Sequence, residues 1–207
     1  TPSNMLPLGT KAPTFNLLDT TSDTYKNLEN LQGAQGTVIA FICNHCPFVI
    51  HINKALVDTA NLYLEKGINF IAISSNDIEK YPQDGPEKMK SHAHDTGYCF
   101  PYLYDETQEI AKAYDAACTP DFYLFDNNLE LVYRGQMDAS RPGNGLENDA
   151  GDLIHAMDCL LKKTPNEAAQ KPIIGCNINH NKNVKNMCIK IRILKKHPIV
   201  LKRLQKR

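Results

Sequence analysis

The chain has 207 residues, of which 42% are hydrophobic and 22% are charged, and its formal net charge is zero. This composition is ordinary for a soluble globular protein, and the length fits one domain with appendages. No apolar run reaches the roughly 18 residues that a membrane-spanning helix needs, so the sequence predicts no such helix.

The N-terminal part predicts a small β-hairpin followed by a strand–helix–strand unit. Glycine and proline residues interrupt the segment 9–33, and the short apolar run within it favours a hairpin. Residues 37–42 form a β-branched and aromatic run that is typical of a buried strand. From Pro47 the apolar residues recur every three or four positions, which predicts an amphipathic helix ending near Gly67. Residues 68–73 predict a second buried strand, parallel to the first because a helix connects the two.

The rest of the body predicts short helices and strands after a polar loop at residues 74–85. The predicted elements are a helix at 86–96, a strand at 102–104, a short helix at 107–114, a hairpin of strands 122–125 and 129–133, and an amphipathic helix at 152–163.

The C-terminal part changes in composition. Residues 168–207 hold eleven Lys and Arg and no Asp or Glu, so the first 167 residues carry 12 basic and 23 acidic side chains. We place a boundary near Thr164-Pro165, which predicts a domain at 1–165 and a basic extension at 166–207. A tail without a role is favoured over one that binds a membrane surface or nucleic acid.

A pair of cysteines with two residues between them, Cys43 and Cys46, carries the strongest chemical signal. It lies between a predicted buried strand and a predicted helix. The unpaired N–H groups at a helix N-terminus favour negative charge, which lowers the pKa of a thiol and activates it as a nucleophile. The spacing lets the two sulfurs form a disulfide. A redox pair is therefore favoured over a zinc half-site or two inert buried thiols.

A metal site would need further ligands, because structural zinc takes four. A second Cys-x-x-Cys is absent, and the histidines that could contribute are His45, His51, His92 and His94. We therefore predict neither a metal nor a cofactor.

The order of attack follows from Pro47. Proline favours the first helical position. Pro47 at that position would place Cys46 at the N-cap, nearest the partial positive charge of the helix N-terminus, and Cys43 in the preceding loop. We favour Cys46 as the attacking thiol and Cys43 as the resolving one, although the thioredoxin pattern would favour Cys43. His45 either stabilises the thiolate and shuttles protons or is a solvent-exposed loop residue.

Thr119-Pro120 stands directly before the predicted hairpin. A proline entering a strand is unusual because it removes a ladder donor. The bond is either cis, as a structural device, or trans at an edge strand, and the pattern alone favours trans. The neighbouring Cys118 is the other cysteine of interest.

The order of these elements resembles the thioredoxin superfamily, and Gly9-Thr-Lys-Ala-Pro-Thr-Phe15 resembles its peroxiredoxin branch. Cys43-Asn-His-Cys-Pro-Phe-Val49, Cys118-Thr-Pro-Asp-Phe122 and Tyr133-Arg-Gly-Gln-Met-Asp-Ala-Ser-Arg-Pro-Gly-Asn144 resemble a group of peroxiredoxin-like proteins. The resemblance covers roughly residues 5–178. It implies an α/β thioredoxin-like fold, with a central mixed sheet flanked by helices and an N-terminal hairpin.

The resemblance also implies roles for individual residues. Thr119-Pro120 would be a cis-proline loop beside the cysteines, with Thr119 contacting the partner's backbone. Pro47 matches the proline that follows the peroxidatic cysteine, so Thr119, Pro120 and Pro47 are the expected substrate-binding residues. Arg141 and Arg134 are candidates for the arginine that stabilises the thiolate and polarises peroxide.

The sequence departs from its relatives in ways that bear on activity. Peroxiredoxins usually carry Thr or Ser where Cys43 stands, which favours disulfide exchange over peroxidase activity. Ile42 replaces the tryptophan that precedes the thioredoxin motif, and residues 37–42 contain no buried acid. Proton transfer from a buried thiol would then need another route, through His45 or water.

Three functions remain open, in decreasing order of preference: a thiol–disulfide oxidoreductase, a peroxiredoxin-like thiol peroxidase that reduces hydroperoxides, and a non-catalytic binding module. The expected partners are protein or small-molecule disulfides or hydroperoxides and a thiol reductant, with no nucleic acid. Seven cysteines, an odd number, fit a reducing compartment. We expect a cytoplasmic location, or an exported one if a leader has been removed.

Overall fold

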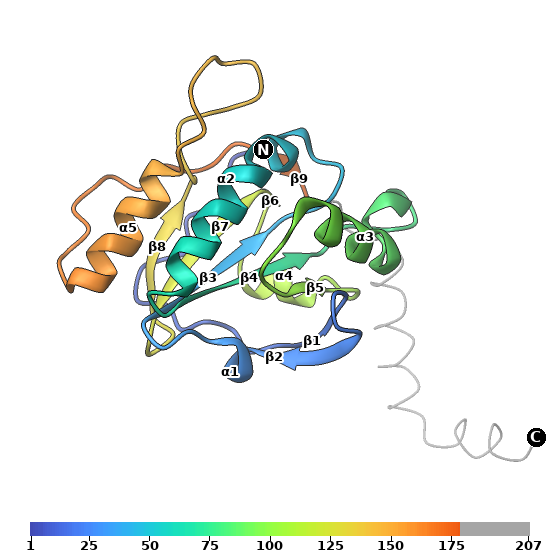
Figure 1. The fold of residues 1–207 in the computed structure, drawn as a ribbon, viewed down its shortest axis with the longest axis horizontal. Coiled ribbons are helices and arrows are strands. Elements are labelled where there is room, and N and C mark those ends of the chain that lie inside the picture. Colours follow the sequence, from blue (N-terminus) through green and yellow to red (C-terminus); the bar gives the residue numbers. More distant parts are fainter. Residues whose placement is uncertain (179–207) are drawn as a thin grey trace, which may run out of the picture.

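The computed structural model describes residues 1–178 and places a seven-stranded mixed sheet at the centre of the protein (Figure 1). The strands in spatial order are β2 (Thr24–Asn27), β1 (Asn16–Asp19), β5 (Tyr102–Tyr104), β4 (Ile68–Ser74), β3 (Gly36–Phe41), β7 (Asp121–Asp126) and β8 (Leu131–Gly135). A separate two-stranded sheet pairs β6 (Cys118–Thr119) with β9 (Cys176–Asn177).

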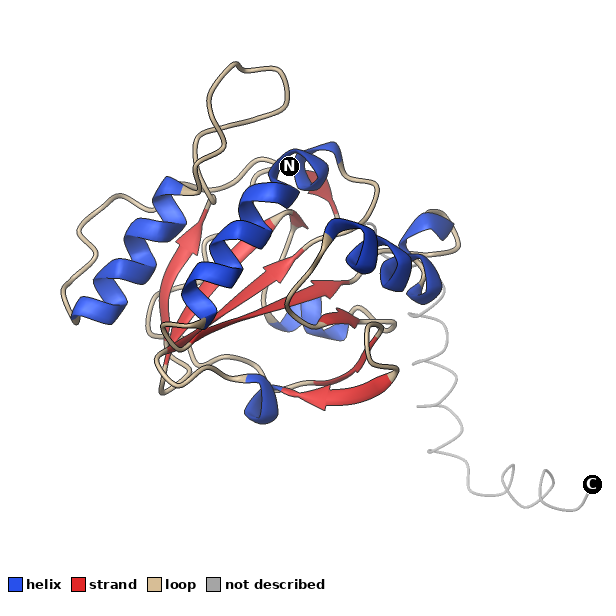
Figure 2. Cartoon of the chain, viewed as in Figure 1, coloured by secondary structure: helices blue, strands red, loops and turns tan. Residues whose placement is uncertain are grey.

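Helices cover both faces of the large sheet (Figure 2). They are α1 (Leu28–Leu31), α2 (Pro47–Leu64), the short 3-10 helix η1 (Pro82–Asp84), α3 (Pro86–Thr96), α4 (Glu109–Ala113) and α5 (Gly151–Lys162). One apolar core lies between the sheet and α2, α3 and α5, and contains both Cys43 and Cys46. The other core lies on the opposite face, towards α1 and α4.

The architecture confirms the predicted fold: an α/β protein with a central mixed sheet flanked by helices and an N-terminal hairpin. β1 and β2 pair antiparallel, β3 and β4 pair parallel, and β7 and β8 form the second predicted hairpin. β3 and β4 are buried on both faces, which is why their sequences read as continuous apolar runs rather than as alternating ones.

The end of α2 differs slightly from the prediction. The helix stops at Leu64, and its C-cap is Glu65 in a right-handed conformation. Gly67 follows with a φ of +83°, so glycine is needed in the turn into β4 rather than at the cap itself.

Three short elements escaped the sequence analysis: α1, η1, and the pairing of β6 with β9. η1 lies within the stretch that was expected to be a plain polar loop. β9 lies within the stretch assigned to the basic extension, so residues up to Ile178 pack against the domain. The remaining part of that extension, 179–207, lies outside the described residues. Among the residues that are described, no helix is long and apolar enough to cross a membrane.

Candidate active site

Cys43 and Cys46 lie just beyond the end of β3, where the chain turns into α2. β3 is flanked by β4 on one side and β7 on the other, so the turn starts from the middle of the sheet. Cys46 is the N-cap residue of α2 and Pro47 is its first residue, as predicted. The Cys46 carbonyl accepts hydrogen bonds from the N–H groups of Val49 and Ile50 at 2.9 and 3.0 Å. Both cysteines are buried, with 1% and 0% of their surface exposed.

The Cys46 sulfur is surrounded by groups that stabilise its thiolate. A hydrogen bond with the Cys43 thiol is the largest influence that lowers the pKa of Cys46 to about 5. Hydrogen bonds with Cys176, Thr119 and the Val49 backbone N–H act in the same direction, while burial opposes them. The Thr119 carbonyl lies 3.2 Å from the sulfur and accepts its proton when Cys46 is a thiol. Cys46 is therefore the thiol that ionises first.

Cys43 is the protonated member of the pair. Its hydrogen bond to Cys46 raises the pKa of Cys43 far above the ordinary value, and burial and the nearby Asp84 carboxylate raise it further. The Cys43 sulfur lies 3.4 Å from the Thr119 hydroxyl. Of the two sulfurs, Cys46 therefore carries the negative charge and Cys43 keeps its proton.

A buried carboxylate, Asp84 of η1, fixes the loop between the two cysteines. It accepts hydrogen bonds from the Asn44 backbone N–H at 2.9 Å, from the Asn76 amide at 2.9 Å and from His45 Nδ1 at 2.7 Å. The ring of Tyr81 stacks on His45, with centroids 4.5 Å apart. His45 is thus half-buried and held on two sides, unlike a free loop histidine. Asp84 supplies the buried acid that β3 itself lacks.

Cys43, His45 and Asp84 bring three potential ligand atoms within 4.8 Å of one another. A structural zinc site needs a fourth ligand, and the Asp84 oxygens already accept three hydrogen bonds. The other candidate histidines bond elsewhere: His51 to Ser140, His92 to Tyr98 and His94 to Asp95. The observed geometry is that of a hydrogen-bonded network, and the absence of a metal stays a prediction.

The Thr119–Pro120 bond is cis, as the resemblance implied and contrary to the preference from pattern alone. Thr119 belongs to β6 and is 1% exposed. Its hydroxyl faces Cys43 and its carbonyl faces Cys46, so the cis-proline loop lies directly over the cysteine pair. The predicted contact of Thr119, Pro120 and Pro47 with a substrate stays a prediction.

A third thiol, Cys176 of β9, lies in the same site and was missed by the sequence analysis. Its sulfur is 2.8 Å from the Cys46 sulfur, and Thr119 is its register partner across the β6–β9 pair. The sequence marks this position only by Gly175, which directly precedes Cys176. In the structure, a Cβ on Gly175 would lie 2.2 Å from the Thr119 carbonyl oxygen. Only glycine permits so close an approach of the two backbones.

We expect Gly175→Ala to destabilise the protein by about 1–3 kcal/mol, because the added methyl group would push β9 away from Thr119. Urea denaturation of both proteins measures the change. Gly85→Ala is the matched control, since its Cβ would meet a single backbone oxygen at 3.3 Å, and it should change the stability by less than about 0.5 kcal/mol. Equal effects of the two substitutions would contradict the close packing of β9 on β6.

Neither predicted arginine hydrogen-bonds to a cysteine among the contacts of the described residues. Arg134 is fully buried and lies 3.3 Å from Asp121 Oδ2 and 3.2 Å from the Tyr123 hydroxyl. Side chains alternate along β8, so Arg134 points to the face opposite that of Tyr133, which packs in the core that contains the cysteines. The expectation that Arg134 stabilises the thiolate therefore has no contact to support it.

Arg141 lies closer to the site. Its guanidinium donates to the carbonyls of Asp138 and Ser140 and to the Gln136 side chain. Together with Pro120 and Phe48 it lines a shallow groove beside the cis-proline loop. Arg141 is therefore at the rim of the site, and its predicted role at the thiolate stays a prediction.

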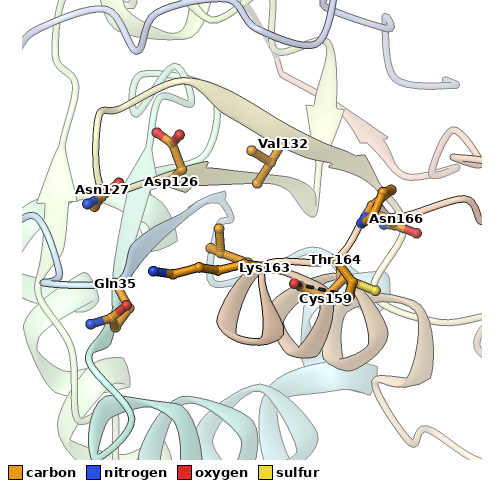
Figure 3. A pocket seen from close by; sticks show the side chains of 11 residues that line it. Gln35, Asp126, Asn127, Val132, Cys159, Lys163, Thr164 and Asn166 are labelled. Carbon is orange, nitrogen blue, oxygen red and sulfur yellow. Dashed lines mark hydrogen bonds between the residues drawn. The ribbon is translucent and has the colours of Figure 1, made fainter.

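A larger cavity of about 590 Å³ lies between α5 and the β7–β8 hairpin (Figure 3). Lys163, Asp126 and Asn127 line it. Asp126 pairs with Gly36 at the start of β3, whereas the cysteines follow the end of that strand. The cavity and the cysteine cluster are therefore at opposite ends of the sheet.

Comparison with known proteins places this site in a family. The AhpC/TSA family matches residues 8–134, which include both cysteines and the cis-proline. A comparison with curated proteins finds no match. Among solved structures, an uncharacterized conserved protein from Geobacillus kaustophilus has 54% identity and a TM-score of 0.86, covering 88% of this chain and 96% of that one. A hypothetical protein from Sinorhizobium meliloti has 42% identity and a TM-score of 0.86, covering 88% and 99%.

More distant structures share the fold alone. The peroxidoxin BcpB from Mycobacterium tuberculosis has 16% identity and a TM-score of 0.59, covering 78% of this chain and all of that one. With a thioredoxin-like fold, a buried cysteine pair at a helix N-terminus and a cis-proline above it, the chain belongs to the AhpC/TSA family.

Proposed function

We propose that the protein is a thiol–disulfide oxidoreductase in which Cys46 attacks a disulfide of its substrate and Cys43 resolves the product. Membership of the AhpC/TSA family supports thiol–disulfide or peroxidase activity in general. The observation that carries the finer proposal is the position of Cys46 at the N-cap of α2, with Thr119 against both site sulfurs. In this setting the pKa of Cys46 is lowered and that of Cys43 is raised.

The chemistry proceeds in two exchanges. The Cys46 thiolate attacks one sulfur of the substrate disulfide, forms a mixed disulfide and releases the other sulfur as a thiolate. The Cys43 sulfur then attacks Cys46, which forms the Cys43–Cys46 disulfide and releases the second substrate thiolate. Both electrons pass to the substrate, and the reverse sequence would oxidise a dithiol.

The proton of Cys43 must leave before the second exchange. His45, hydrogen-bonded to Asp84, is a basic group close to Cys43, since its ring nitrogen and the Cys43 sulfur lie within 4.8 Å of each other. We assign His45 and Asp84 the role of moving this proton, through an intervening water or after a small shift of the ring. The fixed hydrogen bond and the stacked Tyr81 hold the histidine in place for that step.

The alternative function is a thiol peroxidase, in which peroxide oxidises Cys46 to a sulfenic acid and a second thiol condenses with it, releasing water. The family membership and Pro47 directly after Cys46 favour it. Disulfide exchange is preferred because a cysteine stands three residues before Cys46, and because neither Arg134 nor Arg141 is bonded to the site sulfurs.

The test exposes reduced protein to oxidised glutathione and, in parallel, to hydrogen peroxide, and follows the intact mass over time. We expect oxidised glutathione to remove two hydrogens from the wild type rapidly and to leave Cys46→Ser reduced at the site. Cys99→Ser, which alters an exposed cysteine, is the matched control and should behave as wild type.

The outcomes separate the three functions. Oxidation by peroxide at least about a hundredfold faster than by the disulfide, at equal concentration, would overturn the proposal in favour of the peroxidase. A cysteine pair that remains reduced with both reagents would leave only the binding module.

A further inference from the structure

The reduced site contains three sulfurs in contact rather than the two of the Cys-x-x-Cys motif. Cys43 is the largest influence that lowers the pKa of Cys46, and the Cys176 sulfur lies 2.8 Å from the Cys46 sulfur. A disulfide bond is about 2.05 Å long, so less than about 1 Å of movement would join Cys46 to Cys176. Cys46 therefore has two potential disulfide partners within one site.

The three thiols differ in their access to solvent. Cys43 and Cys46 are 1% and 0% exposed, whereas Cys176 is half-buried. A disulfide between Cys43 and Cys46 would consequently offer an external reductant less access than one that includes Cys176. A disulfide between Cys46 and Cys176 would include one half-buried residue, Cys176.

Cys176 is held in this position by the fold. Its strand pairs with β6, and Ile173 and Ile178 on either side are 3% and 4% exposed. The Ser3 N–H also donates to the Ile173 carbonyl at 2.9 Å. The short distance to Cys46 thus belongs to a packed strand that is anchored at both ends.

We propose that Cys176 is a third redox-active thiol. It replaces Cys43 as the disulfide partner of Cys46, and the reductant then attacks the resulting Cys46–Cys176 disulfide. This inference rests on the proposed function for the reactivity of Cys46. In the first step the Cys176 sulfur attacks Cys46 in the Cys43–Cys46 disulfide. The Cys46–Cys176 bond forms, the Cys43–Cys46 bond breaks, and Cys43 leaves and takes up the proton that Cys176 loses. The number of electrons in the protein does not change.

The second step is reduction from outside. The thiolate of a thiol reductant attacks the half-buried Cys176 sulfur, and Cys46 leaves as a thiolate. A second reductant thiol then attacks the mixed disulfide, releasing Cys176 and the oxidised reductant. The direction of attack is favourable because the thiol of lowest pKa leaves fastest, and Cys46 has the lowest pKa of the three.

The protonation of Cys176 follows the redox state of Cys46. In the reduced protein, three effects raise the pKa of Cys176 to about 12: its burial, its hydrogen bond to Cys46 and the negative charge of Cys46. Cys176 then remains a thiol and donates its hydrogen to the Cys46 thiolate. Once Cys46 is part of a disulfide its charge is gone, so two of these three causes weaken and Cys176 ionises more easily.

The first experiment maps the disulfides. Full-length wild type, Cys43→Ser and the control Cys99→Ser are oxidised with oxidised glutathione, quenched in acid, digested and analysed by peptide mass. We expect a cross-linked pair of peptides joining Cys46 to Cys176 in Cys43→Ser. In the wild type we expect this species together with the Cys43–Cys46 disulfide. A wild type with the Cys43–Cys46 bond only, and a Cys43→Ser variant that keeps glutathione on Cys46, would overturn the inference.

The second experiment measures the rate at which reduced glutathione restores the thiols of the oxidised protein. We expect Cys176→Ser to slow this reduction at least about tenfold, because only the buried disulfide remains, while Cys99→Ser keeps the wild-type rate. An unchanged rate in Cys176→Ser would overturn the relay and leave the proposed function standing. If Cys46 is oxidised in none of these proteins, the proposed function falls, and this inference with it.

Discussion

Ultraviolet titration of the reduced wild type should show one thiolate that forms with a midpoint near pH 5, and Cys43→Ala should raise that midpoint by more than about one pH unit. The reason is that the hydrogen bond from the Cys43 thiol is the largest of the influences that lower the pKa of Cys46 to about 5. Alanine removes this donor, whereas burial, which opposes ionisation, remains. The thiolate absorbance as a function of pH measures both midpoints.

The same shift affects stability, and its sign follows from linkage. The pKa of Cys46 is lower in the folded protein than the 9.0 of an unperturbed cysteine. The folded state therefore holds fewer protons than the unfolded state between about pH 5 and pH 9, and stability rises with pH through this window. Cys43→Ala should flatten this rise in urea denaturation, whereas Cys99→Ser should retain it. A wild-type midpoint near pH 9, or equal midpoints in the two proteins, would contradict the network around Cys46.

Replacing the buried Arg134 by Met should destabilise the protein by about 3–5 kcal/mol near pH 8, because it leaves the Asp121 carboxylate buried without its cation. Both side chains are 0% exposed and 3.3 Å apart. The double variant Arg134→Met/Asp121→Leu should recover much of the loss, since it leaves no charge in the apolar core. Urea denaturation of the two single variants and the double variant gives the coupling directly.

The pH dependence of this pair has the opposite sign to that of Cys46. Burial raises the pKa of Asp121 to about 7, with Arg134 acting against it. A raised carboxyl pKa means that the folded state holds the extra proton, so the stability from this group falls as pH rises from about 4 to about 7. Without Arg134 the pKa rises further, and Arg134→Met should be less destabilised at pH 5 than at pH 8. A destabilisation that does not depend on pH would contradict the buried pairing.

This variant also tests the role that the resemblance implied for Arg134. A structural cation on the far face of the sheet should leave the Cys46 titration unchanged in Arg134→Met/Asp121→Leu. A rise in the Cys46 midpoint in this double variant would instead assign Arg134 to the thiolate. Arg141→Ala supplies the comparison, because Arg141 lies at the rim of the site beside Pro120.

Local sequence patterns were sufficient for the elements that carry the cysteine pair. Apolar runs of strand length marked β3 and β4, because a strand buried on both faces has few polar positions. Pro47 fixed the start of α2 and hence Cys46 as its N-cap, because proline lacks the N–H that a first-turn residue does not use. The preference for Cys46 as the attacking thiol came from this local rule.

The partners of that pair were decided by tertiary structure. Asp84 lies 38 residues after Cys46, in a stretch whose composition predicts a plain polar loop, yet it accepts the hydrogen bonds that hold Asn44 and His45. Cys176 lies 130 residues from Cys46 and was placed in the basic extension. The two-residue strands β6 and β9 are too short to have a sequence period, so their pairing could not be read locally.

The sequence by itself thus determined most of the strands and helices, the position of the two motif cysteines and which of them ends at the helix N-terminus, because these depend on hydrophobic periodicity and on proline geometry within a few neighbouring residues. The arrangement of these elements into a thioredoxin-like fold was implied by the family resemblance. Only the tertiary structure decided which groups set the charge on Cys46, that a third sulfur lies against it, and that Arg134 faces the other side of the sheet. These facts depend on contacts between segments far apart in the chain, which local composition does not encode.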